Sequence, residues 1–389
     1  ESNGASSFSS PTVIDGVTNI TVTTVASASG GSEAESIQSI KLNAPLDYAA
    51  QGRAVTTKDY EVYVKKLFPT TQAVSVWGGE DGSYNSATGV SSTPEYGKVF
   101  ISIKSTTGVD LTSAQKTNLE TALAPYKVAS ITPVVVDAET TSIILNITIM
   151  YDTSATTYTG DQIASLVATT VENYSASDLQ SFNTPFRHSR LLGLIDATDS
   201  SILNSIVTVT MAKLFTPTIS TATSYNINFN NRFYNPVSGY NETAGGVIAS
   251  TGFYLSNVTT TIYFFDDDGA GNIRIYSLVS GVRTYSNNAA GTIDYENGLI
   301  SIGSVIITGV AEVDGTASSQ IRITALPNSN DITPVRNQIL EIDTTNTTYS
   351  SNVDATASTG VGYSTTTTSA GTTTTSVASV SSTPSSSAY

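Results

Sequence analysis

Cysteine is absent from this chain of 389 residues. Its absence excludes a disulfide framework, a thiolate nucleophile and a zinc site with cysteine ligands. The redox compartment stays open, because a particle assembled in the cytosol and a disulfide-free surface protein both fit. A chain of this length can bury a sizeable core without disulfides or metals, and it has room for two or three domains.

Basic residues are also scarce. The 17 Lys and Arg stand against 32 Asp and Glu, which gives a formal charge of −15. Binding to a phosphate backbone needs clustered Lys and Arg, so we expect no nucleic-acid partner. We expect no membrane partner either, since the longest apolar runs, such as Ser142–Met150, are far shorter than the roughly 20 residues that span a bilayer.

The composition is polar but weakly charged. Charged residues make up only 13 % of the chain, whereas Thr, Ser, Asn and Tyr are plentiful. β-Branched and aromatic residues suit strands, and a surface of this kind is typical of long-lived assemblies and of extracellular adhesins. The chain opens with neither a signal peptide nor a Met, so we expect that Glu1 is not the true start.

The first predicted domain spans residues 37–140 and follows an extended arm, residues 1–36. An extended polar segment leads into a helix in which Thr56 is the N-cap and Asp59 the third helical residue, close to a capping-box pattern. Two strands, a second helix and a further strand follow. The order α-β-β-α-β predicts helices on one face of a small sheet.

A second α+β unit is predicted over residues 141–216. A long strand precedes a helix capped by Thr159 and Gln162. A further helix is expected to begin with Pro185 at its first position, and another strand closes the unit. Two α+β units in series are therefore the predicted architecture of this half.

The pattern changes in the second half of the chain. Residues 217–343 alternate short strands with Gly and Asn turns, which predicts an all-β meander or barrel-like domain. Residues 344–389 are mostly Ser, Thr, Gly and Ala, with one acidic residue, Asp354, and no basic one. Such a tract buries little apolar area, so it is expected to be a low-complexity tail.

Few residues could carry catalysis. His188 is the only histidine, and a triad could combine it with Ser189 or Ser181 and Asp196. No G-x-S-x-G elbow surrounds any serine, and a lone histidine in a helical segment is more often a packed or surface residue. The neighbouring arginines are expected to bind carboxylates instead.

Two acidic stretches allow alternative roles. "DDDGAGN" at Asp266–Asn272 superficially follows a calcium loop, but Ala270 and Ser277 stand where oxygen ligands are expected, so a hairpin turn is favoured. Glu80 and Asp81 could serve a hydrolase acting on glycans, although a solvated loop tip explains them more simply. We therefore predict no catalytic residue, no cofactor and no metal ligand.

Several segments resemble one known family. The stretch "SEAESIQSIKLNAPLDYAAQGRAVTTKDYEVYVKKLFP", with "GRAVTTKDY" as its most specific part, is similar to the baseplate J-like and wedge proteins of contractile phage tails. Further segments resemble the large wedge subunit of myoviruses in the same order: "FNTPFRHSRLLGLIDATDSSILNS", "FFDDDGAGNIRIY", "GTIDYENGLISI" and "NSNDITPVRNQILEID". The Ser/Thr-rich tail and the lack of a helical N-terminal part depart from the family.

The resemblance implies a structural protein of the virion, placed in the tail baseplate and assembled in the host cytoplasm. Such subunits pair with copies of themselves, contact other wedge and hub proteins, and join wedges into a ring that rearranges when the sheath contracts. Five residues are the interface candidates, with Arg53 expected to anchor the loop before its helix: Arg53, Arg187, Arg190, Asp331 and Arg336. An acidic, Thr-rich surface adhesin or S-layer-like protein is the alternative.

Overall fold

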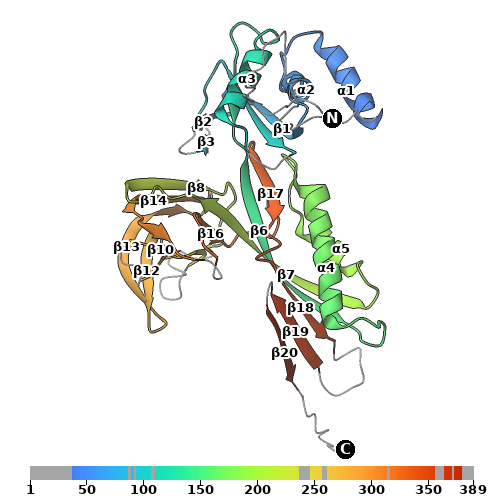
Figure 1. Ribbon diagram of the computed structural model, residues 1–389, viewed down its shortest axis with the longest axis vertical. Coiled ribbons are helices and arrows are strands. Elements are labelled where there is room, and N and C mark those ends of the chain that lie inside the picture. The colour runs from blue at the N-terminus through green and yellow to red at the C-terminus, as the bar shows by residue number, and fades with distance from the viewer. Residues whose placement is uncertain are drawn as a thin grey trace, which may run out of the picture. The chain divides into compact units, whose positions relative to one another are not determined.

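The computed structural model describes residues 37–85, 89–91, 93–106, 110–235, 246–255, 261–312, 316–354, 363–369 and 372–378. The predicted arm, residues 1–36, lies outside these ranges. The chain divides into two compact units. Unit 1 runs to Ala138, and unit 2 runs from Glu139 and includes the short segment Asn85–Gly89. Most of the regular structure is β, as Figure 1 shows.

Three helices belong to unit 1: α1 (Ile37–Ala50), α2 (Thr57–Leu67) and α3 (Ser113–Leu123). The capping box that Thr56 and Asp59 predict for α2 is present, with both reciprocal hydrogen bonds. Helix α1 corrects the sequence interpretation, which expected an extended segment there. It contains Pro45 and no apolar stripe, so neither of the usual helix signals marks it.

The sheet of unit 1 has the order β1–β4–β5, and its strands are β1 (Thr71–Gly78), β4 (Lys98–Ser105) and β5 (Thr132–Val136). Strand β4 runs antiparallel to β1 and parallel to β5. Helices α2 and α3 pack on one face, where Val64 and Leu123 meet Ile101. A 3₁₀ turn η1 (Gly79–Asp81) and the pair β2 (Ser83–Asn85) and β3 (Gly89–Ser91) lie between β1 and β4.

Unit 2 is built around two long antiparallel strands, β6 (Glu139–Tyr151) and β7 (Ile202–Phe215). Beyond β7 lie β16 (Ile321–Ala325) and β9 (Ile248–Ser250). On the other side β17 (Gln338–Ile342) and β18 (Thr348–Val353) pair in parallel with successive parts of β6. Two further strands extend the sheet from β18: β19 (Tyr363–Ser369) and β20 (Thr372–Ala378).

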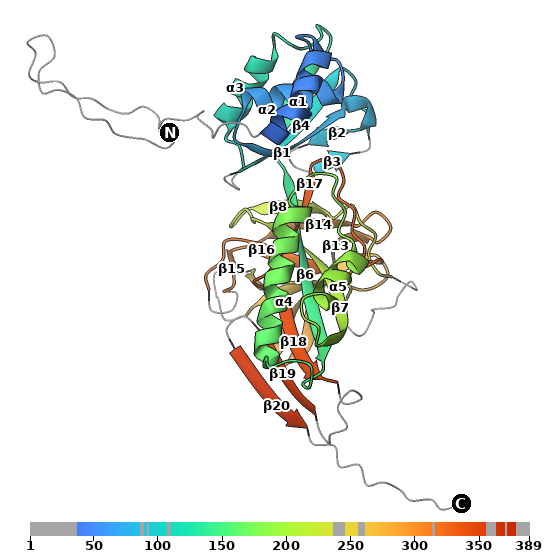
Figure 2. The same ribbon diagram turned by 90° about the vertical axis from the view of Figure 1, so that its right-hand side faces the viewer.

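Helices α4 (Gly160–Tyr174) and α5 (His188–Asp196) lie over one face of this sheet (Figure 2). A π-helical turn η2 (Ser175–Leu179) continues α4. The Thr159 and Gln162 capping box is confirmed. Pro185 does not open α5 as predicted, because the preceding backbone is drawn into a bridge between Phe186 and Ile332, far along the chain.

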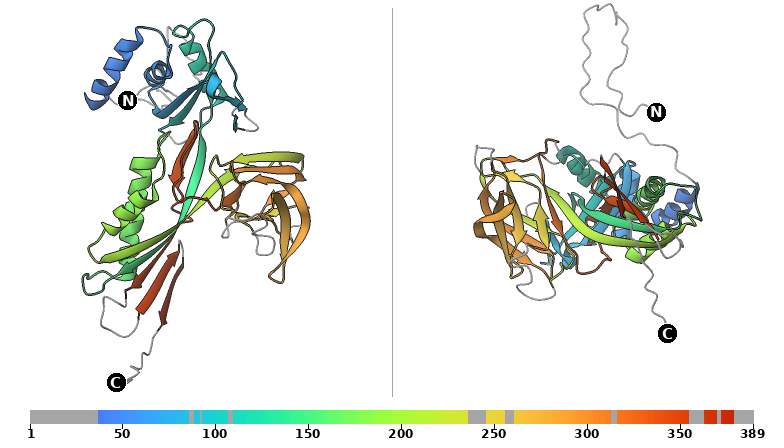
Figure 3. Two further views of the ribbon diagram at one scale, coloured as in Figure 1. Left: turned by 180° about the vertical axis from the view of Figure 1, so that it is seen from behind. Right: turned by 90° about the horizontal axis from the view of Figure 1, so that it is seen from below.

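A second sheet of unit 2 curls into a half-barrel, seen from behind in Figure 3. Its order is β15–β10–β11–β12–β13–β14–β8. The strands are β8 (Ala222–Asn228), β10 (Phe253–Tyr254), β11 (Tyr263–Asp267), β12 (Asn272–Val279), β13 (Val282–Asp294), β14 (Leu299–Ile306) and β15 (Gly309–Val310). The strands from β10 to β14 pair in sequence order, as the predicted β meander requires, whereas β15 and β8 pair out of order at the two edges.

Strand β18 falls in the segment that composition separates as a tail. Its Tyr349 and Ser351 are buried, and its backbone completes the ladder beside β6. A segment rich in Ser and Thr can form a strand when a neighbouring strand is present to pair with it. Composition alone does not reveal that such a neighbour exists. No helix in the described ranges is long and apolar enough to cross a bilayer.

Candidate functional site

Two of the five candidate residues meet in one ion pair. Arg187 is the residue before α5, and its Nη1 lies 2.9 Å from Asp331 Oδ2. The other carboxylate oxygen of Asp331 accepts from the His188 backbone N–H at 2.9 Å. The hydrogen bonds from Arg187 and this N–H hold the pKa of Asp331 below its usual value. The pair therefore fastens the start of α5 to the segment that leads into β17.

The adjacent backbone makes the same connection. Phe186 and Ile332 exchange two backbone hydrogen bonds, of 2.9 and 3.1 Å, and both side chains are fully buried. This buried backbone bridge adjoins the exposed ion pair in sequence, so both contacts hold the same two segments together. The ion pair and the backbone bridge together therefore form a clamp within unit 2.

Arg190 and Arg336 have other surroundings. Arg190 Nη2 lies 2.6 Å from Asp178 Oδ1, so it joins α5 to the π-helical turn η2. Arg336 is half-buried and has a left-handed backbone, with φ of 52°. Arg190 thus pairs with an aspartate other than Asp331, and Arg336 lies in the segment between Asp331 and β17.

Arg53 does not anchor the loop before α2. Its side chain is exposed and has no polar partner in the part of the chain that the structure describes. The Asp59 carboxylate holds that loop by accepting from the backbone N–H groups of Val55 and Thr56. The buried Ala54 adds a 2.7 Å bond from its N–H to the carbonyl of Tyr126. Arg53 is therefore left available on the surface.

His188 is engaged in packing. Its Nε2 lies 3.0 Å from the carbonyl oxygen of Val207 on β7. Asp196 accepts a 2.6 Å hydrogen bond from Ser205 and is not the partner of the histidine. The triad that the sequence allowed is not assembled, and His188 is a packed residue bonded to its own fold.

The acidic stretch between β11 and β12 forms the predicted hairpin turn. Asp268 accepts from the backbone N–H groups of Ala270 and Asn272, which closes the turn. Asp267 is buried and accepts from the N–H of Ile248 and the hydroxyl of Tyr295. These bonds use the carboxylates as structural acceptors. No cluster of three or more metal-ligating side chains occurs among the residues described.

Asp266 forms a buried cluster that the sequence interpretation missed. Its two oxygens lie 2.9 and 3.2 Å from Nε and Nη2 of Arg274. One oxygen also accepts from Arg283 Nη1 at 3.1 Å and from the Tyr285 hydroxyl at 3.0 Å. The guanidinium of Arg274 lies over the Tyr285 ring, and that of Arg283 lies over the Tyr276 ring. Alternation along β11 and β12 could have placed Asp266 beside Arg274, but only with the strand register known.

Glu80 and Asp81 lie in the exposed turn η1. Backbone bonds shape their surroundings: the N–H groups of Gly82 and Glu95 both donate to the carbonyl of Gly79. Both acids are exposed in this turn, which fits the loop-tip interpretation.

Comparison with known proteins gives a consistent result. The family described as "Baseplate structural protein gp6, C-terminal domain I" matches residues 56–136, and "Baseplate structural protein gp6, C-terminal domain III" matches residues 139–214. Baseplate wedge protein gp6 of Enterobacteria phage T4 is 27 % identical over 224 residues, which cover 55 % of this chain and 32 % of the T4 protein. The matched part thus spans about a third of that relative's length. The chain carries C-terminal domains of the gp6 family and is a baseplate wedge subunit of a contractile-tailed phage, a structural protein of the virion tail baseplate.

Proposed function

We propose that this subunit joins neighbouring wedges into a ring around the central hub and rearranges when the baseplate triggers sheath contraction. The observation that carries the proposal is that the two family matches fall in two different compact units. Domain I falls within unit 1 and domain III within unit 2. Two separately packed units in one chain give a subunit two bodies with which to contact different neighbours.

The polar side chains support a structural role over an enzymatic one. His188 and the acids of the β11–β12 turn bond to their own fold. The large polar surface of a weakly charged chain suits extended protein interfaces. Nothing in the described residues specifically favours the adhesin alternative.

The interface candidates enter this proposal in two groups. Arg53, Arg187 and Arg190 are exposed and extend guanidinium groups toward solvent. Arginine is a frequent residue in protein interfaces because it forms bidentate contacts with carboxylates. Asp331 and Arg336 would support such contacts by fixing the segment before β17.

The oligomeric state tests this proposal. The purified chain is expected to form pairs or larger rings at micromolar concentration, measured by analytical ultracentrifugation and negative-stain electron microscopy. Cross-linking of intact virions, followed by mass spectrometry, is expected to join it to a second copy and to other baseplate proteins. A chain that stays monomeric and yields no baseplate cross-links would overturn the proposal.

A charge reversal tests the assignment of Arg187. Arg187→Glu should weaken assembly while leaving the fold intact, because the pair it loses is exposed. Lys58→Glu is the matched control, since Lys58 is also exposed and pairs with an acid, Glu61, in unit 1. Assembly that survives Arg187→Glu unchanged would remove Arg187 from the interface.

A further inference from the structure

Strand β20 forms one edge of the eight-stranded sheet of unit 2. The sheet order begins β20–β19–β18–β6, and β20 pairs with β19 along its whole length, from Thr372 to Ala378. Figure 2 shows β20 as the outermost strand. Within the described ranges, no strand pairs with its other side. Every second residue of an edge strand directs its N–H and C=O groups away from its partner, so this edge presents a row of backbone donors and acceptors.

The β20 edge has none of the features that ordinarily prevent pairing with another chain. Short strands, lysine, proline and bulges are the usual protection. The opposite edge of the same sheet is protected by its length, because β9 has only three residues. Strand β20 has seven residues, and its sequence is TTTTSVA, with no charge and no proline. Its register with β19 is free of bulges, so a further strand can be added beside it.

The pairing of β20 with β19 indicates which strand fits this edge. Both strands contain a run of four threonines, and the antiparallel register sets the two runs against each other, with Thr367 opposite Thr374 at the centre. Threonine suits strands, and opposed threonines stabilise a strand pair. A second β20 would present the same run on the open side that β19 presents on the other. The sequence of β20 is therefore complementary to itself.

The distribution of charge also favours a second copy over a charged partner. The chain carries −15, so two copies repel each other through most of their length. No residue after Asp354 has a charged side chain. Strand β20 is thus a place where two copies can approach without opposing like charges. An uncharged edge offers no attraction to a basic partner, which would be drawn to the acidic parts of the chain instead.

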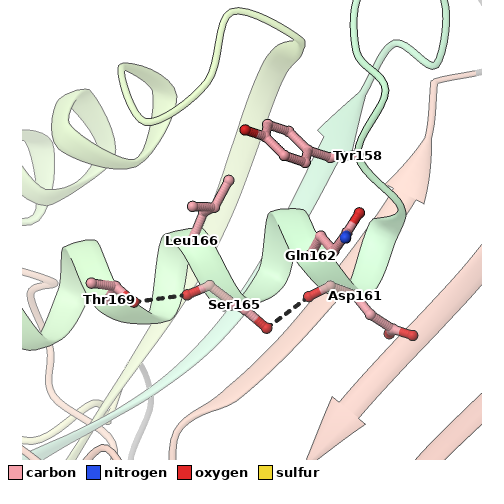
Figure 4. A pocket seen from close by; sticks show the side chains of 6 residues that line it. All are labelled: Tyr158, Asp161, Gln162, Ser165, Leu166 and Thr169. Atoms are coloured by element: carbon pink, nitrogen blue, oxygen red, sulfur yellow. Dashed lines mark hydrogen bonds between the residues drawn. The ribbon is translucent and has the colours of Figure 1, made fainter.

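The outer surface of α4 provides a contrast, because it too is rich in serine and threonine. Figure 4 shows Ser165 and Thr169, whose hydroxyls donate to carbonyls of their own helix at 2.9 and 3.1 Å. The backbone groups of a helix interior are likewise paired within the helix. Serine and threonine side chains alone therefore do not make a docking site. The open backbone edge is what distinguishes β20.

We propose that β20 of one copy pairs antiparallel with β20 of a second copy, so that the two sheets become continuous. The contact is isologous, because both copies contribute the same strand about a two-fold axis. A single pair of strands is far smaller than a stable interface of roughly 1,200 Å² or more. It therefore acts as an additional contact between copies already brought close. In this respect it rests on the proposed function, in which copies of the subunit meet in the baseplate.

Cysteine cross-linking of the full chain tests the pairing directly, because the chain has no cysteine of its own. Thr374→Cys protein, oxidised gently, should form disulfide-linked dimers at least about tenfold faster than Thr169→Cys protein, because facing strands hold the two thiols together. Thr169 is the matched control, an exposed threonine of the same unit. A run of identical residues permits register slips, so Thr373→Cys and Thr375→Cys should also react fast.

Opposed charges provide the second measurement. In a pair centred on Thr374, position 372 of one copy faces position 376 of the other. Adding Thr372→Lys and Ser376→Lys to the Thr374→Cys chain should slow dimer formation by about threefold, because lysines then face lysines. The same chain with Thr372→Glu and Ser376→Glu should be slowed equally. Mixing the two chains should restore fast formation of the mixed dimer, a result that misfolding of either chain cannot give.

The outcomes separate this contact from the proposed function. Dimers of Thr374→Cys that form no faster than those of Thr169→Cys overturn the pairing of β20. The pairing is also overturned if the lysine and glutamate chains cross-link as fast as the neutral chain. Rings seen by electron microscopy without fast cross-linking leave the proposed function standing and remove this contact from it. Fast, charge-sensitive cross-linking of chains that form no ring supports the contact and counts against the ring.

Discussion

Two aspartate–arginine pairs in unit 2 have the same shortest contact distance and different surroundings. In both, the shortest nitrogen–oxygen distance is 2.9 Å. The Asp266 and Arg274 side chains are 2 % and 7 % exposed, whereas those of Asp331 and Arg187 are 39 % and 54 % exposed. Coulombic attraction is far stronger in the dry site, but so is the cost of removing both charges from water.

The pKa directions of the two aspartates express this difference. Burial raises the pKa of Asp266 in spite of the hydrogen bonds from Arg274 and Tyr285. The bond from Arg187 lowers the pKa of Asp331, where water still solvates the carboxylate. A short contact distance alone therefore does not tell how much a pair stabilises a fold.

The largest effect is expected from Asp266→Ala. It leaves the buried Arg274 with the Asp267 carbonyl but without its carboxylate partner, and removing one partner of a buried pair costs about 3–5 kcal/mol of unfolding free energy. Urea denaturation followed by circular dichroism measures the loss. The control is the double variant Asp266→Leu with Arg274→Met, which should stay much closer to the parent because no buried charge is left unpaired. Arg283, which also loses its carboxylate partner, is 39 % exposed and stays solvated. A loss below about 1 kcal/mol for Asp266→Ala would show that the cluster stabilises the fold no more than an exposed ion pair does.

Arg274→Lys should have an intermediate effect. An ammonium group cannot reproduce the two contacts to Asp266 or the stacking over Tyr285, so about 1.5–3 kcal/mol of stability should be lost. The matched change, Arg187→Lys, keeps a solvated charge near Asp331 and should cost about 0.5 kcal/mol or less. Equal losses in the two variants would show that burial does not separate the pairs.

Local features of the fold could be predicted from the sequence, and distant contacts could not. The caps at Thr56 and Thr159 bond within three residues of themselves, so their chemistry is visible in the sequence. The Arg187–Asp331 pair joins residues 144 positions apart. Both residues were chosen as interface candidates through a family resemblance, but nothing in the sequence pairs them with each other.

The Asp266 cluster shows the same limit. The sequence predicts a turn for the whole acidic stretch, which is right for Asp268 but incomplete for Asp266. Assigning Arg274 and Tyr285 to Asp266 requires the register of three strands, including two irregularities between β12 and β13. Period-2 alternation gives the face of each residue, but the opposing neighbour depends on where bulges fall.

The pH dependence of the two aspartates should have opposite signs. The folded pKa of Asp331 lies below its unfolded value of roughly 3.9, so its stabilisation is present above that pH and is lost as pH falls through the folded pKa. The folded pKa of Asp266 is raised, so the folded state takes up its proton first on acidification. Denaturation midpoints between pH 3 and 6 should therefore show the advantage of the parent over Asp331→Asn shrinking toward acid. The stability advantage of the parent over Asp266→Asn should instead grow toward acid. If the midpoints of parent and variants changed with pH in parallel, the pKa directions given for both aspartates would be contradicted.

The smallest effect is expected from Arg190→Ala. Arg190 and Asp178 are 2.6 Å apart, closer than either of the other two pairs, yet Arg190 extends into solvent from α5. An exposed pair contributes about 0–1 kcal/mol, because holding two long side chains offsets most of the attraction. Arg187→Ala should cost slightly more, since Asp331 also accepts from the His188 backbone and is fixed in place. Thermal denaturation of both variants, at low and at high salt, decides the order. If Arg190→Ala were the more damaging change, the contributions of these three pairs to stability would follow contact distance rather than burial and preorganisation.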